Sequence, residues 1–274
     1  MAVFRSRFAW RGFFAASLLL MNFSAFAAYR GMVDSSDGLN EALLVRVGHG
    51  LPGLDKDVEM ATAIAEHESY QFKPTFLAEA QGTAKNVGAN LTQLVEKTGS
   101  DGTFFFYYTG HGSTGSIYLQ DGSMPIAAIR SAMEKGRAAL GPMKRLVLMF
   151  DSCYSGSLLD PVRDLLPLNQ VYDSRVASAL FADAVVEAMT PRRDEKGYWE
   201  ELFVFASSRA DETSLAGQTG SRFTVALKKA FDEVIATENA TLGDWVAKTQ
   251  EYTKGHHPVA RFAPQTLENE LMLP

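Results

Sequence analysis

The chain has 274 residues, of which 46% are hydrophobic and 21% charged, a composition typical of a globular protein with a sizeable core. Its formal net charge is −6 at pH 7, and Lys and Arg form no run within the body of the chain. A partner bound through its phosphate backbone is therefore not expected, and we predict no nucleic-acid binding.

The N-terminal segment has the pattern of a targeting signal. Arginines precede an apolar stretch over residues 13–23, and the small residues Ala25 and Ala27 stand at the two positions that a signal peptidase reads. We predict a signal peptide over residues 1–27 and a mature chain of residues 28–274. The protein is then exported, to the periplasm or the extracellular space.

An uncleaved membrane anchor is the alternative for this segment. Eighteen residues without charge separate Arg11 from Arg30, which is near the lower limit for a membrane span. We predict contact with a membrane only if this segment is retained.

Short β-like runs alternate with longer helical runs along the mature chain. The predicted strands cover residues 42–47, 75–79, 104–108, 145–150 and 202–207. The predicted helices cover residues 54–67, 83–97, 125–137 and 223–235. Strands that alternate with crossover helices predict a single α/β domain with a mostly parallel sheet, covered by helices on both faces. Between the last two strands, prolines and charges in residues 160–201 predict a flexible loop.

The single cysteine, Cys153, lies just past an apolar run in the stretch RLVLMFDSCYSGSLLD. An exported chain usually oxidises its cysteines to disulfides, but a lone cysteine has no partner within its own chain. Cys153 is therefore a free or an intermolecular thiol. A lone cysteine is often no more than a small buried apolar residue.

Two strands that are expected to be buried end in chemically active residues. The strand at 104–108 runs into His111 and Gly112, and the strand at 145–150 runs into Cys153. Functional residues of open parallel sheets gather beyond the carboxyl ends of the strands. If the strands are neighbours, a thiolate and an imidazole face each other, as in a cysteine peptidase. The backbone N–H groups of Gly112 and Cys153 would then stabilise the oxyanion.

A structural histidine and a metal ligand are the alternatives for His111. A lone His-Gly and a lone Cys lack the close ligand spacing of zinc sites, which disfavours a metal.

The segments YYTGHGS and LVLMFDSCYSG resemble the paired His-Gly and Asp-x-Cys-x-Ser-Gly signatures of caspase-like peptidases, in particular of the metacaspase branch. LPGLDKDVEMATAIAE resembles the family's first turn and helix, and FVFASSRADETS with SRFTVALKKAF resembles its small-subunit strand and helix. The resemblance covers about residues 42–232. It implies a caspase-hemoglobinase fold and a cysteine endopeptidase with a His111–Cys153 dyad, acting through a thioester acyl-enzyme.

The resemblance also implies a substrate class. Metacaspases cleave after Arg or Lys, and the acids of their specificity pocket match Asp57 and Asp151, while Ser207 ends the strand on which the family's substrate backbone pairs. Residues i and i+2 of an extended segment point the same way, so Asp151 is expected on the side of Cys153. A carboxylate near a thiol disfavours the thiolate, and a bound basic side chain would remove that penalty.

Calcium and self-cleavage are further expectations from the resemblance. Many metacaspases bind calcium through several acids, and Asp160 matches the one that lies seven residues after the cysteine. Calcium requires about six or more oxygen ligands, so Asp160 alone does not establish a site, and the dyad itself requires no cofactor. Basic residues in the segment 160–201 are candidate sites of self-cleavage. The alternative functions are a catalytically silent scaffold and a protease of the same clan that cleaves after Asp or Asn.

Overall fold

The computed structural model describes residues 39–48, 50–113, 115–153, 185–186, 188–190, 197–207, 218–253, 258–270 and 272. The predicted signal peptide, Asp160 and most of the segment 160–201 lie outside these residues. Among the described residues, no helix combines the length and the apolar character needed to span a bilayer.

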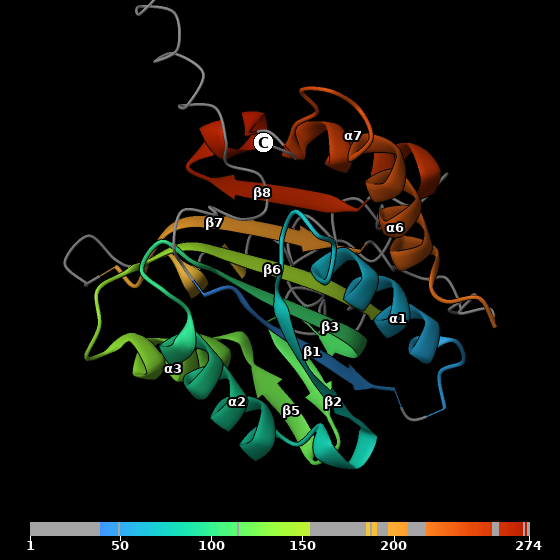
Figure 1. The fold of residues 1–274 in the computed structure, drawn as a ribbon. Helices are drawn as coiled ribbons and strands as arrows, with labels where there is room; N and C mark the ends of the chain where they lie inside the picture. The colour runs from blue at the N-terminus through green and yellow to red at the C-terminus, as the bar shows by residue number, and fades with distance from the viewer. Residues whose placement is uncertain are drawn as a thin grey trace, which may run out of the picture.

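Eight strands and five α-helices follow one another along the described chain (Figure 1). The strands are β1 (Glu41–Val47), β2 (Lys73–Ala78), β3 (Thr103–Ser113), β4 (Ser116–Leu119), β5 (Gly122–Pro125), β6 (Met143–Cys153), β7 (Trp199–Ala206) and β8 (Val259–Ala263). The helices are α1 (Leu54–Ala65), α2 (Ala84–Lys97), α3 (Ile126–Arg137), α6 (Arg222–Val234) and α7 (Leu242–Thr253). Two short 3-10 helices are η1 (Glu79–Gln81) and η3 (Gln265–Asn269).

The strands form one sheet in the order β2-β1-β3-β6-β7-β8. The first five are parallel, β8 is antiparallel to β7, and the β4–β5 hairpin extends from the end of β3. Strand β1 thus lies inside the sheet, with β2 on one side of it and β3 on the other. The predicted open, mostly parallel sheet is confirmed.

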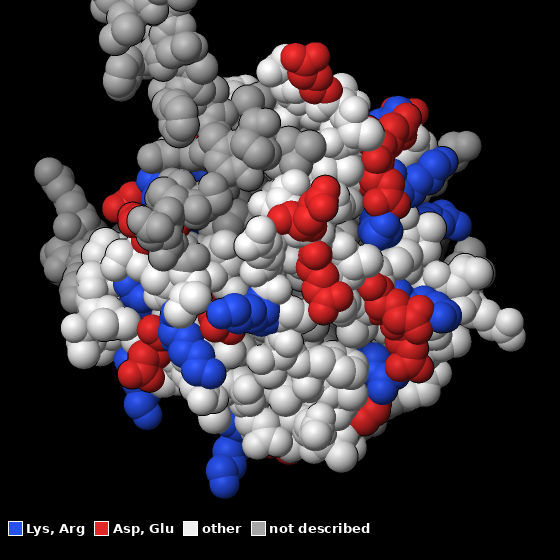
Figure 2. Space-filling view, in the orientation of Figure 1, with Lys and Arg blue, Asp and Glu red and all other residues white. Residues whose placement is uncertain are grey.

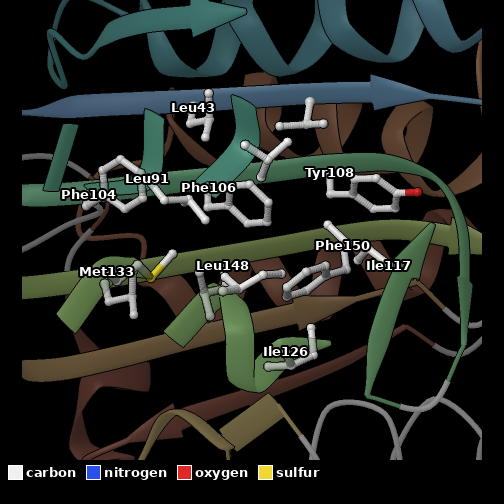
Figure 3. Packing of buried hydrophobic residues seen from close by; sticks show 14 of the residues in the cluster. Leu43, Leu91, Phe104, Phe106, Tyr108, Ile117, Ile126, Met133, Leu148 and Phe150 are labelled. Atoms are coloured by element: carbon white, nitrogen blue, oxygen red, sulfur yellow. The ribbon is translucent and has the colours of Figure 1, made fainter. Parts of the chain in front are cut away.

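Helices cover both faces of this sheet, as predicted (Figure 1). Helices α2 and α3 pack on one face, where they share a buried cluster with Phe104, Phe106 and Tyr108 of β3. Helices α1, α6 and α7 pack on the other face, together with Phe105 and Tyr107 of the same strand. Figure 3 shows the first cluster from close by, with side chains of β3 and β6 meeting those of the two helices. Because both faces of β3 are buried, its apolar run is continuous rather than alternating.

The main differences from prediction concern the ends of elements and the short elements. Strands β3 and β6 continue past their apolar runs and include His111 and Cys153. Strand β7 begins at Trp199, so it takes up the last residues of the segment assigned to a loop. The hairpin β4–β5, helix α7 and strand β8 were not predicted. Charged residues of both signs are spread over the face shown in Figure 2, and the described part of that face has no extended basic patch.

The amino end of β6 carries a buried ion pair. The side chain of Arg145 is fully buried, and its Nε and Nη2 atoms donate to Oε2 of Glu201 on β7 at 2.8 and 2.5 Å. Lys144 lies 3.1 Å from the same carboxylate, and Glu270 lies 3.6 Å from Arg145. This pairing explains how β7 accommodates a charged residue near its start, inside the sheet.

Candidate active site

His111 and Cys153 occupy opposite positions on neighbouring strands. In the parallel pairing of β3 with β6, Thr109 lies opposite Asp151, Gly110 opposite Ser152, and His111 opposite Cys153. Both residues thus lie at the carboxyl edge of the sheet, where ligands of open α/β sheets bind. The backbone position of Cys153 is described, whereas its side chain lies outside the described set.

The glycines on both sides of His111 are required by close approach of the neighbouring strands. A Cβ atom at Gly110 would lie 2.0 Å from the carbonyl oxygen of Val47 at the end of β1. A Cβ atom at Gly112 would lie 2.8 Å from the Cβ and Oγ atoms of Ser152. Because Ser152 precedes Cys153, the small size of Gly112 lets the two active strand ends lie close together.

The hydroxyl of Tyr108 forms hydrogen bonds with two backbone carbonyl groups near the end of β3. It lies 2.5 Å from the carbonyl oxygen of His111 and 2.6 Å from that of Tyr118 on β4, so its single proton is shared between two acceptors. This contact fixes the backbone of His111 against the β4–β5 hairpin.

The two acids predicted from the sequence are brought together by a serine that was not predicted. Asp57 of α1 and Asp151 of β6 are both fully buried. The N–H of Ser221 donates to Oδ1 of Asp57 at 2.6 Å, and the hydroxyl of Ser221 donates to Oδ2 of Asp151. One residue at the start of α6 therefore bonds both carboxylates.

Two threonines also donate hydrogen bonds to the acids. The hydroxyl of Thr109 donates to Oδ2 of Asp57 at 3.1 Å, and that of Thr224 donates to Oδ2 of Asp151 at 2.6 Å. Thr109 and Asp151 are also register partners on β3 and β6. The acids thus form one polar cluster with Thr109, Ser221 and Thr224, enclosed between the sheet and the helices α1 and α6.

Tyr107 extends this cluster into the sheet. Its hydroxyl lies 2.7 Å from Oγ1 of Thr224. Since the proton of Thr224 goes to Asp151, Tyr107 is the donor in this contact. Burial, and then the negative charges of Asp151 and Asp57, raise the pKa of Tyr107 well above its ordinary value. The tyrosine therefore stays protonated and donates at any physiological pH.

The sequence contains one signal for Ser221 and Thr224. Serine is favoured at the N-cap of a helix, and Ser221 stands just before the predicted helix. Its Oγ accepts the N–H of Thr224 at 3.0 Å, which is the bond expected of a cap. The cap was detectable from the sequence, whereas the contact with two distant acids was not.

Ser207 lies beside the carboxyl end of β6. Its N–H donates to the carbonyl oxygen of Phe150 at 2.9 Å, and its hydroxyl lies 3.3 Å from the carbonyl oxygen of Ser152. Ser207 therefore extends the pairing of β7 with β6 up to the residue before Cys153. Its role in pairing with a substrate backbone stays a prediction.

The predicted calcium ligand Asp160 lies outside the described residues. Within the described ranges, no three side chains of His, Cys, Asp or Glu gather into a group that could hold a metal ion. Calcium binding therefore stays a prediction that rests on the spacing of Asp160 from Cys153.

Two solved structures are similar to this chain in fold. The crystal structure of protein GSU0716 from Geobacter sulfurreducens matches with a TM-score of 0.58 and 16% identity, covering 85% of this chain and 98% of that one. Caspase-1 from Spodoptera frugiperda matches with a TM-score of 0.52 and 12% identity, covering 86% of this chain and 92% of that one. No curated protein matches the sequence significantly.

The family assignment comes from a comparison that spans most of the chain. The family model of the caspase domain matches residues 42–257, which include both strands of the candidate dyad and the helix that carries Ser221. The two structures above have the same fold. The chain therefore belongs to the caspase domain family, a family of cysteine peptidases.

Proposed function

We propose that the protein is an exported cysteine endopeptidase of the metacaspase type that cleaves after Arg or Lys. The observation that carries this proposal is the pair of buried acids, Asp57 and Asp151, which Ser221 joins at the sheet edge where His111 and Cys153 are register partners. A nucleophile and a base in register give the chemistry, and two acids beside them favour a basic substrate side chain.

In the proposed reaction, the thiolate of Cys153 attacks the carbonyl carbon of the scissile peptide bond. The carbon–sulfur bond forms, and the carbon–nitrogen bond then breaks as His111 delivers a proton to the leaving amine. Water hydrolyses the resulting thioester and frees the new carboxyl end of the substrate. The N–H groups of Gly112 and Cys153 would hold the oxyanion in both steps.

Burial makes the two acids effective in selection. Asp57 and Asp151 are removed from bulk water, so their charges are screened less than charges on the surface. A Lys or Arg side chain that enters gains these interactions, whereas an Asp side chain is repelled by both acids. Binding of the basic side chain also offsets the negative charge near Cys153, which favours the thiolate.

The direct test uses the mature protein from residue 28 onward and its Cys153→Ala variant. Both are assayed on matched fluorogenic peptides that end in Arg, Lys, Asp or Asn, with calcium and with a chelator. Cleavage after Arg or Lys that is lost in the variant is expected. Cleavage after Asp or Asn would refute the proposed specificity for Arg or Lys and would keep the proposed peptidase activity. No cleavage of any peptide would favour the catalytically silent scaffold.

Self-cleavage within residues 160–201 belongs to the same proposal, since this segment contains Arg175, Arg192, Arg193 and Lys196. We expect fragments that end at one of these residues in the wild type and only the intact chain in Cys153→Ala. Mass spectrometry of both proteins checks this, and identical fragments from both would exclude self-cleavage.

Gly112→Ala is expected to reduce kcat by about 10²-fold, because misplacement of a reacting group by about 1 Å has an effect of this size. The new methyl group would stand 2.8 Å from Ser152 and displace the strand that carries Cys153. Steady-state kinetics on an Arg peptide measures the effect. Gly141→Ala is the matched control, because a Cβ atom there meets nothing within 4 Å. Equal kcat in both variants would show that the contact with Ser152 does not position the nucleophile.

A further inference from the structure

We propose that Ser221 is a positioning residue that holds Asp57 and Asp151 in a fixed relation and thereby sets the preference for Arg over Lys. This inference rests on the function proposed above and gives a role to Ser221, the first residue of the segment SRFTVALKKAF, that the dyad does not imply. It depends on three hydrogen bonds that converge on one buried side chain and its backbone N–H.

The backbone N–H, the hydroxyl proton and the Oγ atom of Ser221 each take part in a hydrogen bond of this cluster. Its N–H goes to Asp57, its O–H goes to Asp151, and its Oγ accepts the N–H of Thr224. The residue is fully buried, so water does not compete for these groups. The distance between the two carboxylates is thus set by the few bonds that separate the N and Oγ atoms of a single serine.

Two carboxylates held close together repel each other, and burial strengthens the repulsion. The N–H and O–H dipoles of Ser221 are directed at both charges, and the amino end of α6 adds its own positive potential beside Asp151. These neutral groups hold both carboxyl groups in place before a substrate arrives. The acids are in this sense preorganised for a cation.

Arg and Lys differ in how much they depend on this geometry. The guanidinium group is a rigid, planar fork of donors that bonds carboxylates at fixed positions, whereas the ammonium group of Lys is a compact charge with rotatable donors. If one carboxylate is displaced, the fixed donors of a guanidinium group can no longer bond both carboxylates. The donors of an ammonium group can rotate and still form hydrogen bonds with them. Loss of the Ser221 hydroxyl should reduce cleavage after Arg more than cleavage after Lys.

The kinetic test compares the wild type with Ser221→Ala and Thr83→Ala. Thr83 caps α2 by accepting the N–H of Asn86 at 3.2 Å, so its removal loses a helix cap on the opposite face of the sheet without touching the acids. In Ser221→Ala, kcat/KM for an Arg peptide is expected to fall about tenfold, as for loss of one hydrogen bond to a charged group, with the Lys peptide affected less than threefold or so. The loss should appear mainly in KM. Thr83→Ala should lower Tm to a similar degree and leave the Arg-to-Lys ratio unchanged.

A binding test separates this inference from catalysis. In the Cys153→Ala protein, agmatine and 1,4-diaminobutane are matched dications that differ only by a guanidinium group in the first and an ammonium group in the second, and calorimetric titration gives their Kd values. Adding Ser221→Ala is expected to weaken agmatine about tenfold and 1,4-diaminobutane less, for the same loss of one charged hydrogen bond.

The outcomes distinguish the two proposals. An unchanged Arg-to-Lys ratio and an unchanged Kd for agmatine in the Ser221→Ala proteins would overturn the role of Ser221 and leave the peptidase standing. Agmatine binding that depends on Ser221, in a protein that cleaves no peptide, would keep the role of Ser221 and overturn the endopeptidase. If the protein neither binds agmatine nor cleaves after Arg, both proposals fail.

Discussion

Asp151→Asn is expected to lower kcat/KM on peptides ending in Arg or Lys by about 10²- to 10³-fold, because removing one charge of a desolvated pair costs about 3–4 kcal/mol. The amide keeps the volume of the carboxyl group, so packing at this fully buried position is preserved. The hydroxyls of Ser221 and Thr224 then face an amide in place of the carboxyl group, and the substrate cation loses one of its two proposed partners. Steady-state hydrolysis of the Arg and Lys peptides measures the effect.

Two controls distinguish a specific loss of activity in Asp151→Asn from misfolding of the variant. Asp232→Asn makes the same chemical change at an exposed position, where Asp232 pairs with Lys228 of the same helix, and it should leave kcat/KM unchanged. Alkylation of Cys153 should proceed in Asp151→Asn at least as fast as in the wild type, since a negative charge near the thiol has been removed. Full activity of Asp151→Asn on the Arg peptide would exclude Asp151 from the specificity pocket.

Arg145→Met is expected to lower the free energy of unfolding by about 3–5 kcal/mol, because the change leaves a buried carboxylate without its principal partner. The side chain of Arg145 is fully buried, that of Glu201 is 8% exposed, and two donor atoms of the arginine bond one carboxylate oxygen. Urea unfolding monitored by circular dichroism gives the difference. Because Arg145 lies at the amino end of β6, the kcat of the folded fraction should not change.

The matched variants decide whether the charge pairing is the cause. The double variant Arg145→Met, Glu201→Leu should recover most of the lost stability, since a buried pair can be replaced by apolar residues at little cost. Lys228→Met breaks an exposed pair with Asp232 and should cost less than about 1 kcal/mol. A double variant as unstable as Arg145→Met alone would show that packing, rather than the orphaned charge, is responsible.

The sheet could be predicted because its central strands have a clear sequence pattern. Residues 104–108 and 146–150 are apolar at every position, which is the pattern of strands buried on both faces, and the structure places these two runs side by side. Once these strands are parallel neighbours, the opposite register positions of His111 and Cys153 follow from the geometry of strand ends. The length of β3 beyond its apolar run could not be predicted, since it depends on contacts of Gly110 and Gly112 with other strands.

The missed elements lack such local signals. Strands β4 and β5 have four residues each and β8 has five, too few to establish a period, and β8 carries an arginine. The polar cluster was missed for another reason. Ser221 bonds Asp57 across 164 positions in sequence, and no local pattern contains a contact of that range. Asp57 and Asp151 were found through the family resemblance, and only the structure shows that one serine joins them.

The pairing of β6 with β7 also has a consequence for the covalent chain. These strands are neighbours in the sheet, held by backbone pairing and by both core clusters, while the connection between them spans residues 154–198, of which Val185 and Met189 are buried in one core cluster. A cut in that stretch would divide the protein into two fragments, one with the proposed dyad and both acids, the other with Ser221. Substrate preference would then belong to the complex of the two fragments, and it would fade on dilution below their dissociation constant.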